Sequence, residues 1–197
     1  MNKIIFIEGV SGVGKTTTTT LLINKLRGMG YKAFGYLEGA NDNPLDPFGG
    51  TYPPAMSLTE FTETYLHCWQ KFMEAKFDND FIIIDGTLLH HQINDMLREY
   101  SASHEIIANH LSSLLHVIHP LSPVILYLSS SDVEQRLIQA RKSRMQSVPT
   151  DEQIKFWEDR KRIDLHVLGR LPVKPHILNV DNDWHTMLDT MIGYITV

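Results

Sequence analysis

Residues 9–16 read GVSGVGKT and satisfy the pattern G-x-x-x-x-G-K-[ST] at every fixed position. A short apolar run at residues 3–8 precedes this stretch and an amphipathic segment follows it, which is the context that the pattern requires. Glycines let the backbone turn with positive φ, so that consecutive N–H groups surround a phosphate. The dipole of the following helix adds positive potential at the same point. The stretch is therefore predicted to be a phosphate-binding loop (P-loop) between a strand and a helix.

The side chains of this loop have defined roles in such a site. Lys15 reaches the β- and γ-phosphates of a nucleotide, the Thr16 hydroxyl ligates Mg²⁺, and Thr17 adds a further donor. A chain of this length matches the pattern by chance on the order of once in a hundred, so a glycine-rich turn that binds no nucleotide is the weaker interpretation. The predicted nucleotide-binding residues of the loop are Gly9, Ser11, Gly12, Val13, Gly14, Lys15, Thr16 and Thr17.

The P-loop alone does not separate kinases from GTPases or motor ATPases. Guanine-specific GTPases use Asn-Lys-x-Asp after a strand, but the Asn24-Lys25 pair here lies inside the first predicted helix, with Arg27 in the fourth position. A motor of the AAA type needs a longer chain with a sensor region, and none is apparent. A kinase is therefore favoured.

Short apolar runs alternate with longer amphipathic segments along the whole chain. The expected strands are residues 3–8, 32–37, 81–85, 124–128 and 176–180, and the expected helices are residues 15–29, 57–77, 89–100, 103–116, 132–145, 151–168 and 183–194. This alternation implies right-handed crossovers and predicts an α/β fold, a doubly wound, five-stranded parallel sheet with helices on both faces. Ligands of such folds bind beyond the carboxyl ends of the strands. The irregular stretches 38–56 and 146–150 are candidates for an acceptor loop and a lid hinge.

Composition sets the broad class of the protein. The 197 residues suit one domain over 1–197. A formal net charge of −5, from 18 basic and 23 acidic residues, disfavours a general nucleic-acid binder. Cys68 is the only cysteine, so no internal disulfide forms. The sequence has neither a signal-peptide core nor an apolar run of the roughly 20 residues that a membrane span needs. We expect a cytoplasmic protein with no membrane association.

Further landmarks follow the P-loop in a recognisable order. Ile7-Glu8 directly precedes Gly9, Glu38 follows the second expected strand, Asp85 ends the third, and an arginine-rich run follows the fourth. In these features the chain resembles the thymidylate kinase and deoxynucleoside kinase group of P-loop kinases. The resemblance extends over nearly the whole chain, although only the P-loop is highly specific. It implies a sheet order of 2-3-1-4-5 and the use of ATP and Mg²⁺.

The two carboxylates are the predicted catalytic centre. The resemblance places Glu38 where deoxynucleoside kinases keep the base that accepts the proton of the attacking hydroxyl; a solvated loop carboxylate is the alternative, and Asp42 and Asp46 are weaker rivals. Such a base assists an alcohol acceptor, whereas a phosphate acceptor is already ionised. Asp85 is expected to hold Mg²⁺ together with Thr16, unless it only caps the next turn.

Gly86 departs from the resemblance. The related kinases follow the acidic residue of the third strand with an arginine that contacts the acceptor or its phosphate. A thymidylate acceptor is therefore in doubt, and the glycine also motivates an alternative in which the chain binds nucleotide as a regulator and transfers no phosphate.

Residues 136–151 are the expected lid. By resemblance, Arg136 stacks on adenine, while Arg141 and Arg144 clamp phosphates and are counted among the catalytic residues, along with Lys15. Guanidinium groups suit a transition state whose charge spreads over the phosphoryl oxygens. A solvated helix face is the competing interpretation, and the basic run at residues 160–162 is assigned mainly to the surface.

The acceptor site is less defined. Aromatic side chains at Phe61, Tyr65, Trp69 and Phe72 share one helix face. In the related kinases this helix borders the acceptor base, so Tyr65 and Trp69 are predicted acceptor-binding residues, with core packing as the alternative. His90, next to His91, is a further candidate, with Glu38, and surface exposure is its alternative. Tyr36, Tyr52 and Trp157 are weaker additions.

These inferences lead to one functional prediction. The chain is expected to be an ATP-dependent kinase that passes the γ-phosphoryl group to a small nucleoside- or nucleotide-like acceptor. The alternatives are a kinase for another hydroxyl metabolite or an antibiotic-like alcohol, and the non-catalytic regulator. A homodimer is compatible with the resemblance, because the related kinases commonly pair.

Overall fold

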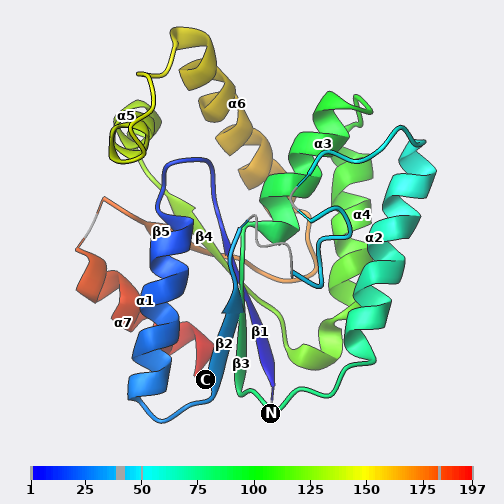
Figure 1. Cartoon of the computed structure of the whole chain (residues 1–197), viewed down its shortest axis with the longest axis vertical. Helices are drawn as coiled ribbons and strands as arrows, with labels where there is room; N and C mark the ends of the chain where they lie inside the picture. Colours follow the sequence, from blue (N-terminus) through cyan, green and yellow to red (C-terminus); the bar gives the residue numbers. More distant parts are fainter. Residues whose placement is uncertain (1, 39–42, 50, 182, 197) are drawn as a thin grey trace.

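The computed structural model describes residues 2–38, 43–49, 51–181 and 183–196, with strands at the bounds expected from the sequence to within two residues. The described strands are β1 Lys3–Glu8, β2 Ala33–Tyr36, β3 Phe81–Asp85, β4 Val124–Ser129 and β5 His176–Asn179. They form one sheet in the order β2-β3-β1-β4-β5, and every neighbouring pair is parallel (Figure 1). The predicted fold class and strand order are confirmed.

Two layers of helices enclose the sheet. The described helices are α1 Lys15–Gly28, α2 Leu58–Met73, α3 Gln92–Arg98, α4 His104–Val117, α5 Val133–Ser143, α6 Asp151–Leu168 and α7 Trp184–Ile195, with a π-helix η1 Thr87–His91 and a 3-10 turn η2 His119–Leu121. Helices α1 and α7 cover one face, and α2 and α4 cover the other (Figure 1). No described helix is both long and apolar enough to cross a membrane.

Strand β1 is buried on both faces because it lies in the middle of the sheet. Successive side chains of a strand point to opposite faces. Ile4 and Phe6 accordingly pack into the core with α2 and α4, whereas Ile5 and Ile7 pack into the core with α1 and α7. This double burial explains the uninterrupted apolar run that precedes the P-loop.

Side-chain caps fix the starts of α2 and α5. Ser57 and Glu60 form a capping box at the start of α2. Asp132 caps α5 and accepts the Gln135 N–H at 2.8 Å. The Ser131 hydroxyl donates to Asp181 at 2.8 Å.

The predicted helix at residues 89–100 is divided in two. A π-helical turn, Thr87–His91, begins directly after Gly86, whose φ is +68°, and α3 continues from it. Such π segments are rare and often occur at functional sites. This turn places His90 and His91 at the carboxyl edge of the sheet.

Arg160 corrects the assignment of the basic run 160–162 to the surface. Its side chain is 1% exposed and forms an ion pair with Asp164 at 2.6 Å. It also donates to the Leu89 carbonyl at 2.9 Å, while the Tyr127 hydroxyl donates to Asp164 at 3.1 Å. A buried charge needs such complete pairing. The network fixes η1 against α6.

Candidate functional site

The P-loop connects β1 to α1 through glycines with positive φ. Gly9, Gly12 and Gly14 have φ values of +143°, +86° and +90°. A Cβ atom on Gly9 would lie 2.5 Å from the Leu128 carbonyl oxygen, and one on Gly12 would lie 2.9 Å from that of Arg136. The loop therefore requires glycine for conformation and for space. The Val13 side chain packs in the core, so this residue contributes only backbone to the loop surface.

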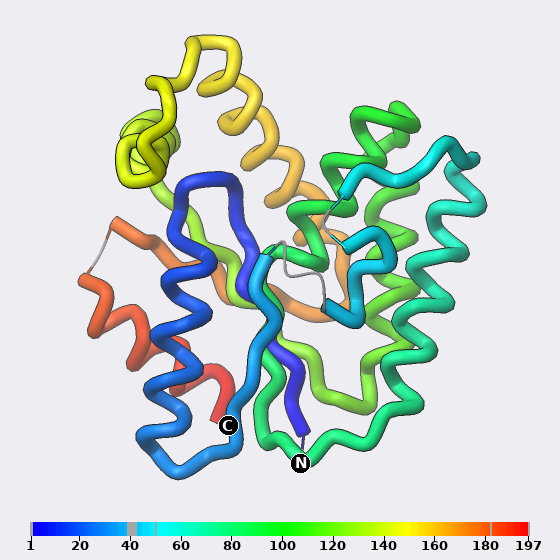
Figure 2. Tube along the Cα trace, viewed as in Figure 1, coloured from blue at the N-terminus to red at the C-terminus, as the bar shows by residue number. Residues whose placement is uncertain are grey.

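A cavity of about 670 Å³ opens at this loop. It brings together the P-loop, the carboxylate after β2 and the last turn of α5. Figure 2 shows the loop after β1 and the end of β2 at the same end of the sheet. The lining residues are Ser11, Gly12, Gly14, Lys15, Thr16, Thr17, Glu38, His91, Gln139, Ala140, Ser143 and Arg144.

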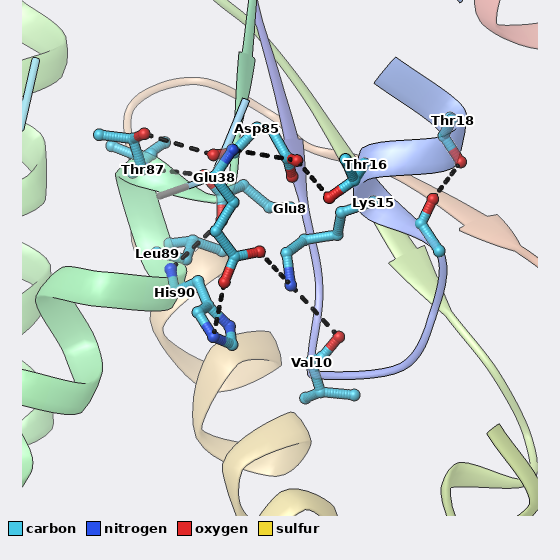
Figure 3. A network of polar contacts seen from close by, with 12 residues as sticks. Glu8, Val10, Lys15, Thr16, Thr18, Glu38, Asp85, Thr87, Leu89 and His90 are labelled. Atoms are coloured by element: carbon cyan, nitrogen blue, oxygen red, sulfur yellow. Dashed lines mark hydrogen bonds and ion pairs between the residues drawn. The ribbon is translucent and has the colours of Figure 1, made fainter. Parts of the chain in front are cut away.

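Thr16, which lines this cavity, is hydrogen-bonded to Asp85, as Figure 3 shows. The Thr16 hydroxyl donates to Asp85 Oδ2 at 2.6 Å, and the Glu38 N–H donates to the same oxygen at 3.2 Å. Burial raises the pKa of Asp85 above its ordinary value, against the effect of the Thr16 hydrogen bond. Asp85 Oδ1 is buried without a hydrogen-bond partner among the described residues. An alcohol and a carboxylate with a spare oxygen are a donor set that fits Mg²⁺.

Lys15 and Glu38 face each other across the site. Lys15 Nζ lies 3.4 Å from Glu38 Oε2 and 3.5 Å from the Val10 carbonyl oxygen (Figure 3). A Cβ atom on Gly86 would lie 3.1 Å from Lys15 Cε and 3.3 Å from Glu38 Oε2. The glycine at this position thus leaves room for this ion pair.

His90 holds the other oxygen of Glu38. Its Nε2 lies 3.4 Å from Glu38 Oε1, and its ring stacks on Trp157 of α6, with centroids 5.3 Å apart and an interplanar angle of 8°. Burial lowers the pKa of His90 well below its ordinary value, and the nearby Lys15 lowers it further. A neutral imidazole carries one N–H, on either ring nitrogen. In the tautomer with the proton on Nε2, His90 would direct this donor at the Glu38 carboxylate.

Glu8, at the end of β1, holds the turn η1 that carries His90. Its carboxyl oxygens accept the N–H groups of Leu88 at 2.8 Å and His90 at 3.3 Å, which fixes the start of η1. Burial raises the pKa of Glu8 to about 8, although Lys15 opposes the shift. The sequence points to Glu8 only through the resemblance, in Ile7-Glu8 before Gly9. Its position in the middle strand, one residue before the P-loop, was the available signal for a buried carboxylate.

The three lid arginines have different surroundings. Arg136 pairs with Asp181 at 3.0 Å and donates to the Val180 carbonyl, so it joins α5 to the loop after β5. Arg141 donates to the Ser147 carbonyl at 3.3 Å, whereas Arg144 lines the cavity. The structure therefore places only Arg144 of the three against the P-loop cavity.

The predicted acceptor platform on α2 is wrong in this conformation. Tyr65 and Trp69 are 1% and 0% exposed, so neither ring is available for stacking. Trp69 stacks on Phe6 and donates through Nε1 to the Leu45 carbonyl at 2.9 Å. The helical stripe is a core face, because α2 packs against the sheet and α4.

The weaker rivals of Glu38 do not replace it. Asp42 lies outside the described residues. Asp46 accepts the Phe48 N–H at 3.0 Å and does not line the P-loop cavity. Of these three carboxylates, Glu38 is therefore the one that the described residues show at the P-loop cavity.

A second cavity of about 410 Å³ adjoins the first, since His91 lines both. Asn94, Asp95 and Arg98, which sequence reasoning missed, come from α3. With His91 they recur at i, i+3, i+4 and i+7, a helix face that could have indicated a site. The residues around this second cavity, called here the α3 pocket, are Thr51, Tyr52, His90, His91, Asn94, Asp95 and Arg98.

Comparison with solved structures agrees with this architecture. The chain is similar to the Bacillus subtilis YorR protein in complex with phosphorylated GDP, with 15% identity, 98% of this chain and 96% of that chain covered, and a TM-score of 0.59. It is also similar to a gluconokinase from Sinorhizobium meliloti 1021, with 14% identity, 99% and 91% covered, and a TM-score of 0.52. No protein-family model and no curated protein matches the chain. The fold is that of the P-loop kinases.

Proposed function

We propose that this chain is an ATP-dependent kinase that transfers the γ-phosphoryl group to a hydroxyl of a small molecule. One observation carries the proposal: Lys15, the Thr16–Asp85 pair and Glu38 converge on a single cavity at the P-loop. Phosphoryl transfer needs positioning and electrostatic stabilisation at one place. The two similar structures support the fold that such a reaction uses, while the acceptor rests on the site alone.

In this proposal each residue has one task. The P-loop amides and Lys15 bind the phosphates of ATP, and Lys15 leaves Glu38 when a phosphate takes its place. Thr16 and Asp85 hold Mg²⁺, which would supply positive charge next to the phosphate oxygens. Glu38, released by Lys15 and still oriented by His90, accepts the proton of the acceptor hydroxyl. Arg144 stabilises the charge that develops on the transferred group.

A hydroxyl acceptor fits this site better than a phosphate acceptor. Glu38 faces the reaction centre as a carboxylate, and an anionic phosphate would be repelled by it. Gly86 supplies no cation at the point where the related kinases place an arginine. The buried rings of Tyr65 and Trp69 also remove the platform that favoured a nucleoside.

The test is acceptor-stimulated release of ADP from ATP and Mg²⁺, over a panel of nucleosides, nucleotides, sugars and polyols. We expect at least one hydroxyl compound to stimulate turnover, and Lys15→Ala to abolish it. Lys15→Arg serves as a control, because it keeps the positive charge but changes the position of the donor groups. Tight binding of ATP with no stimulation by any compound would favour the non-catalytic regulator instead.

A further inference from the structure

Asp95 is a buried carboxylate without a hydrogen-bond donor. It lies on α3, is 8% exposed, and lines the α3 pocket. The described residues give its side chain neither a hydrogen bond nor an ion pair within 4 Å, although the charges of Arg98 and Arg160 act on it from farther away. The Asp95 oxygens are not among the fully buried unpaired atoms of the described residues, so they are reached from the pocket and can accept hydrogen bonds from a ligand there.

The electrostatics of Asp95 agree with a lack of donors. Burial is the main cause that raises its pKa to about 6, and the neighbouring Asp46 and Glu99 act in the same direction. The protein therefore stabilises the charged form of this side chain poorly. A ligand that donates hydrogen bonds would stabilise this carboxylate, because charged acceptors form the stronger bonds.

The α3 pocket lies next to the reaction centre. His91 lines both cavities, and His90, which lines the α3 pocket, also contacts Glu38 at 3.4 Å. A small molecule that binds in the α3 pocket would therefore lie close to Glu38.

The walls of the α3 pocket indicate what kind of molecule it takes. Its side chains are mostly donors and acceptors rather than flat apolar surfaces. Arg98 covers one face of the Tyr52 ring, with its guanidinium 5.4 Å from the ring centroid, and the Tyr52 hydroxyl accepts from Arg98 at 3.1 Å. The His90 ring is stacked on Trp157.

We infer that Asp95 is an acceptor-binding residue and that the acceptor is a small polyhydroxylated compound, with one hydroxyl facing Glu38 and another donating to Asp95. The inference rests on the proposed function, which it narrows from hydroxyl compounds in general to polyols of sugar size. Asn94, Arg98 and His91 would hydrogen-bond the remaining oxygens. Specificity then comes from polar groups that are left without partners when a hydroxyl is missing.

The experiment compares two variants of α3 over a defined panel. Asp95→Asn removes the buried charge, and Glu99→Gln is the matched control, because Glu99 is exposed on the same helix end. The acceptors are D-gluconate, D-glucose, myo-inositol, glycerol, thymidine and deoxycytidine, each with ATP and Mg²⁺. We expect a polyol to be the best acceptor. Asp95→Asn should raise its KM by about 10- to 100-fold, with the KM for ATP within about 3-fold, and Glu99→Gln should change neither.

A role in folding is separated from a role in binding by two further measurements. If Asp95 serves the ligand, Asp95→Asn keeps or raises the melting temperature, since a carboxylate without donors destabilises the folded state. Deoxy analogues of the active polyol identify the hydroxyl that Asp95 accepts. The loss caused by its removal should be large in the wild type and small in Asp95→Asn.

Several results would overturn the inference while leaving a kinase in place. They are turnover with nucleosides alone, an unchanged polyol KM in Asp95→Asn, or a melting temperature that falls by several degrees in that variant. The site can also be tested if the protein shows no kinase activity. For this, each polyol is titrated calorimetrically in the presence of a non-hydrolysable ATP analogue. Polyol binding that Asp95→Asn abolishes, without turnover in the wild type, would support the site and contradict the proposed kinase activity.

Discussion

The ammonium group of Lys15 lies 3.4 Å from the carboxylate of Glu38, which joins the P-loop to the end of β2. Each partner of this ion pair has a separate role in the proposed reaction: Lys15 binds phosphate, and Glu38 accepts a proton. Phosphate and Glu38 therefore compete for Lys15. Nucleotide binding should free Glu38 for the acceptor, which couples the two binding steps through a single contact.

Substitution of Glu38 by glutamine tests its role as the base. Glu38→Gln keeps the size of the side chain but cannot accept the hydroxyl proton, so turnover should fall by about 100-fold or more. Affinity for ATP should stay the same or rise slightly, because Lys15 loses a competing partner. Steady-state kinetics and calorimetry with ATP measure the two effects. Near-normal turnover would remove Glu38 as the base.

Gly86 should tolerate no side chain. In Gly86→Ala the new Cβ would lie 3.1 Å from Lys15 Cε and 3.3 Å from Glu38 Oε2, at a φ of +68°. We expect a loss of about 1 kcal/mol in stability from the backbone strain, and turnover reduced by about 10-fold or more because the ion pair is displaced.

Gly30 offers the matched control for Gly86. Its φ is +91° and a Cβ atom there would meet nothing within 4 Å. Gly30→Ala should therefore show a similar loss of stability in chemical denaturation but normal turnover. Equal turnover in both variants would mean that the space at Gly86 has no part in the reaction.

Arg144 and Arg141 should differ in their effect on catalysis. Arg144 lines the P-loop cavity, whereas Arg141 donates to the Ser147 carbonyl. Arg144→Ala is expected to lower turnover by about 100-fold through lost stabilisation of developing charge. Arg141→Ala is expected to reduce it by less than about 10-fold. A larger effect from Arg141 would show that closure of the lid brings that residue to the site instead.

Glu8 makes stability depend on pH in a known direction. Its pKa is about 8 in the folded protein, mainly because of burial, against an ordinary value of 4.5. Between these values the folded state holds a proton that the unfolded state releases, so the free energy of unfolding should decrease as pH rises from about 4.5 to 8. Chemical denaturation across this range measures the slope. Glu8→Gln should show a flatter dependence, and parallel curves for the two proteins would contradict the assignment.

Much of the fold followed from local sequence patterns. The P-loop is defined by fixed residues at fixed spacing, and the apolar strands Phe81–Asp85 and Lys3–Glu8 lack polar alternation because helices cover both faces of the sheet. The carboxylates Glu38 and Asp85 could be placed because each follows a strand, and parallel strands end at the same edge. Their pairing with Lys15 and Thr16 is a consequence of that topology.

The residues of the acceptor site could not be predicted from the strand ends in the same way. A helical stripe containing Tyr65 and Trp69 identifies one face of α2, but not whether that face meets the core or a ligand. Arg160 reads as a surface residue within a basic run, and only the packing of α6 against η1 buries it. The π-helical turn before α3 shifts the phase of that helix, which determines that Asp95 faces the cleft.

Calorimetric titration of the folded protein with ATP and Mg²⁺ tests the central claim most directly. The amides of residues 9–16 and Lys15 should bind the nucleotide with a dissociation constant below about 1 mM, and binding should weaken when Mg²⁺ is withheld or when Lys15 is replaced by alanine. A wild-type protein that is folded by circular dichroism, yet takes up no nucleotide at millimolar concentration, would contradict the claim.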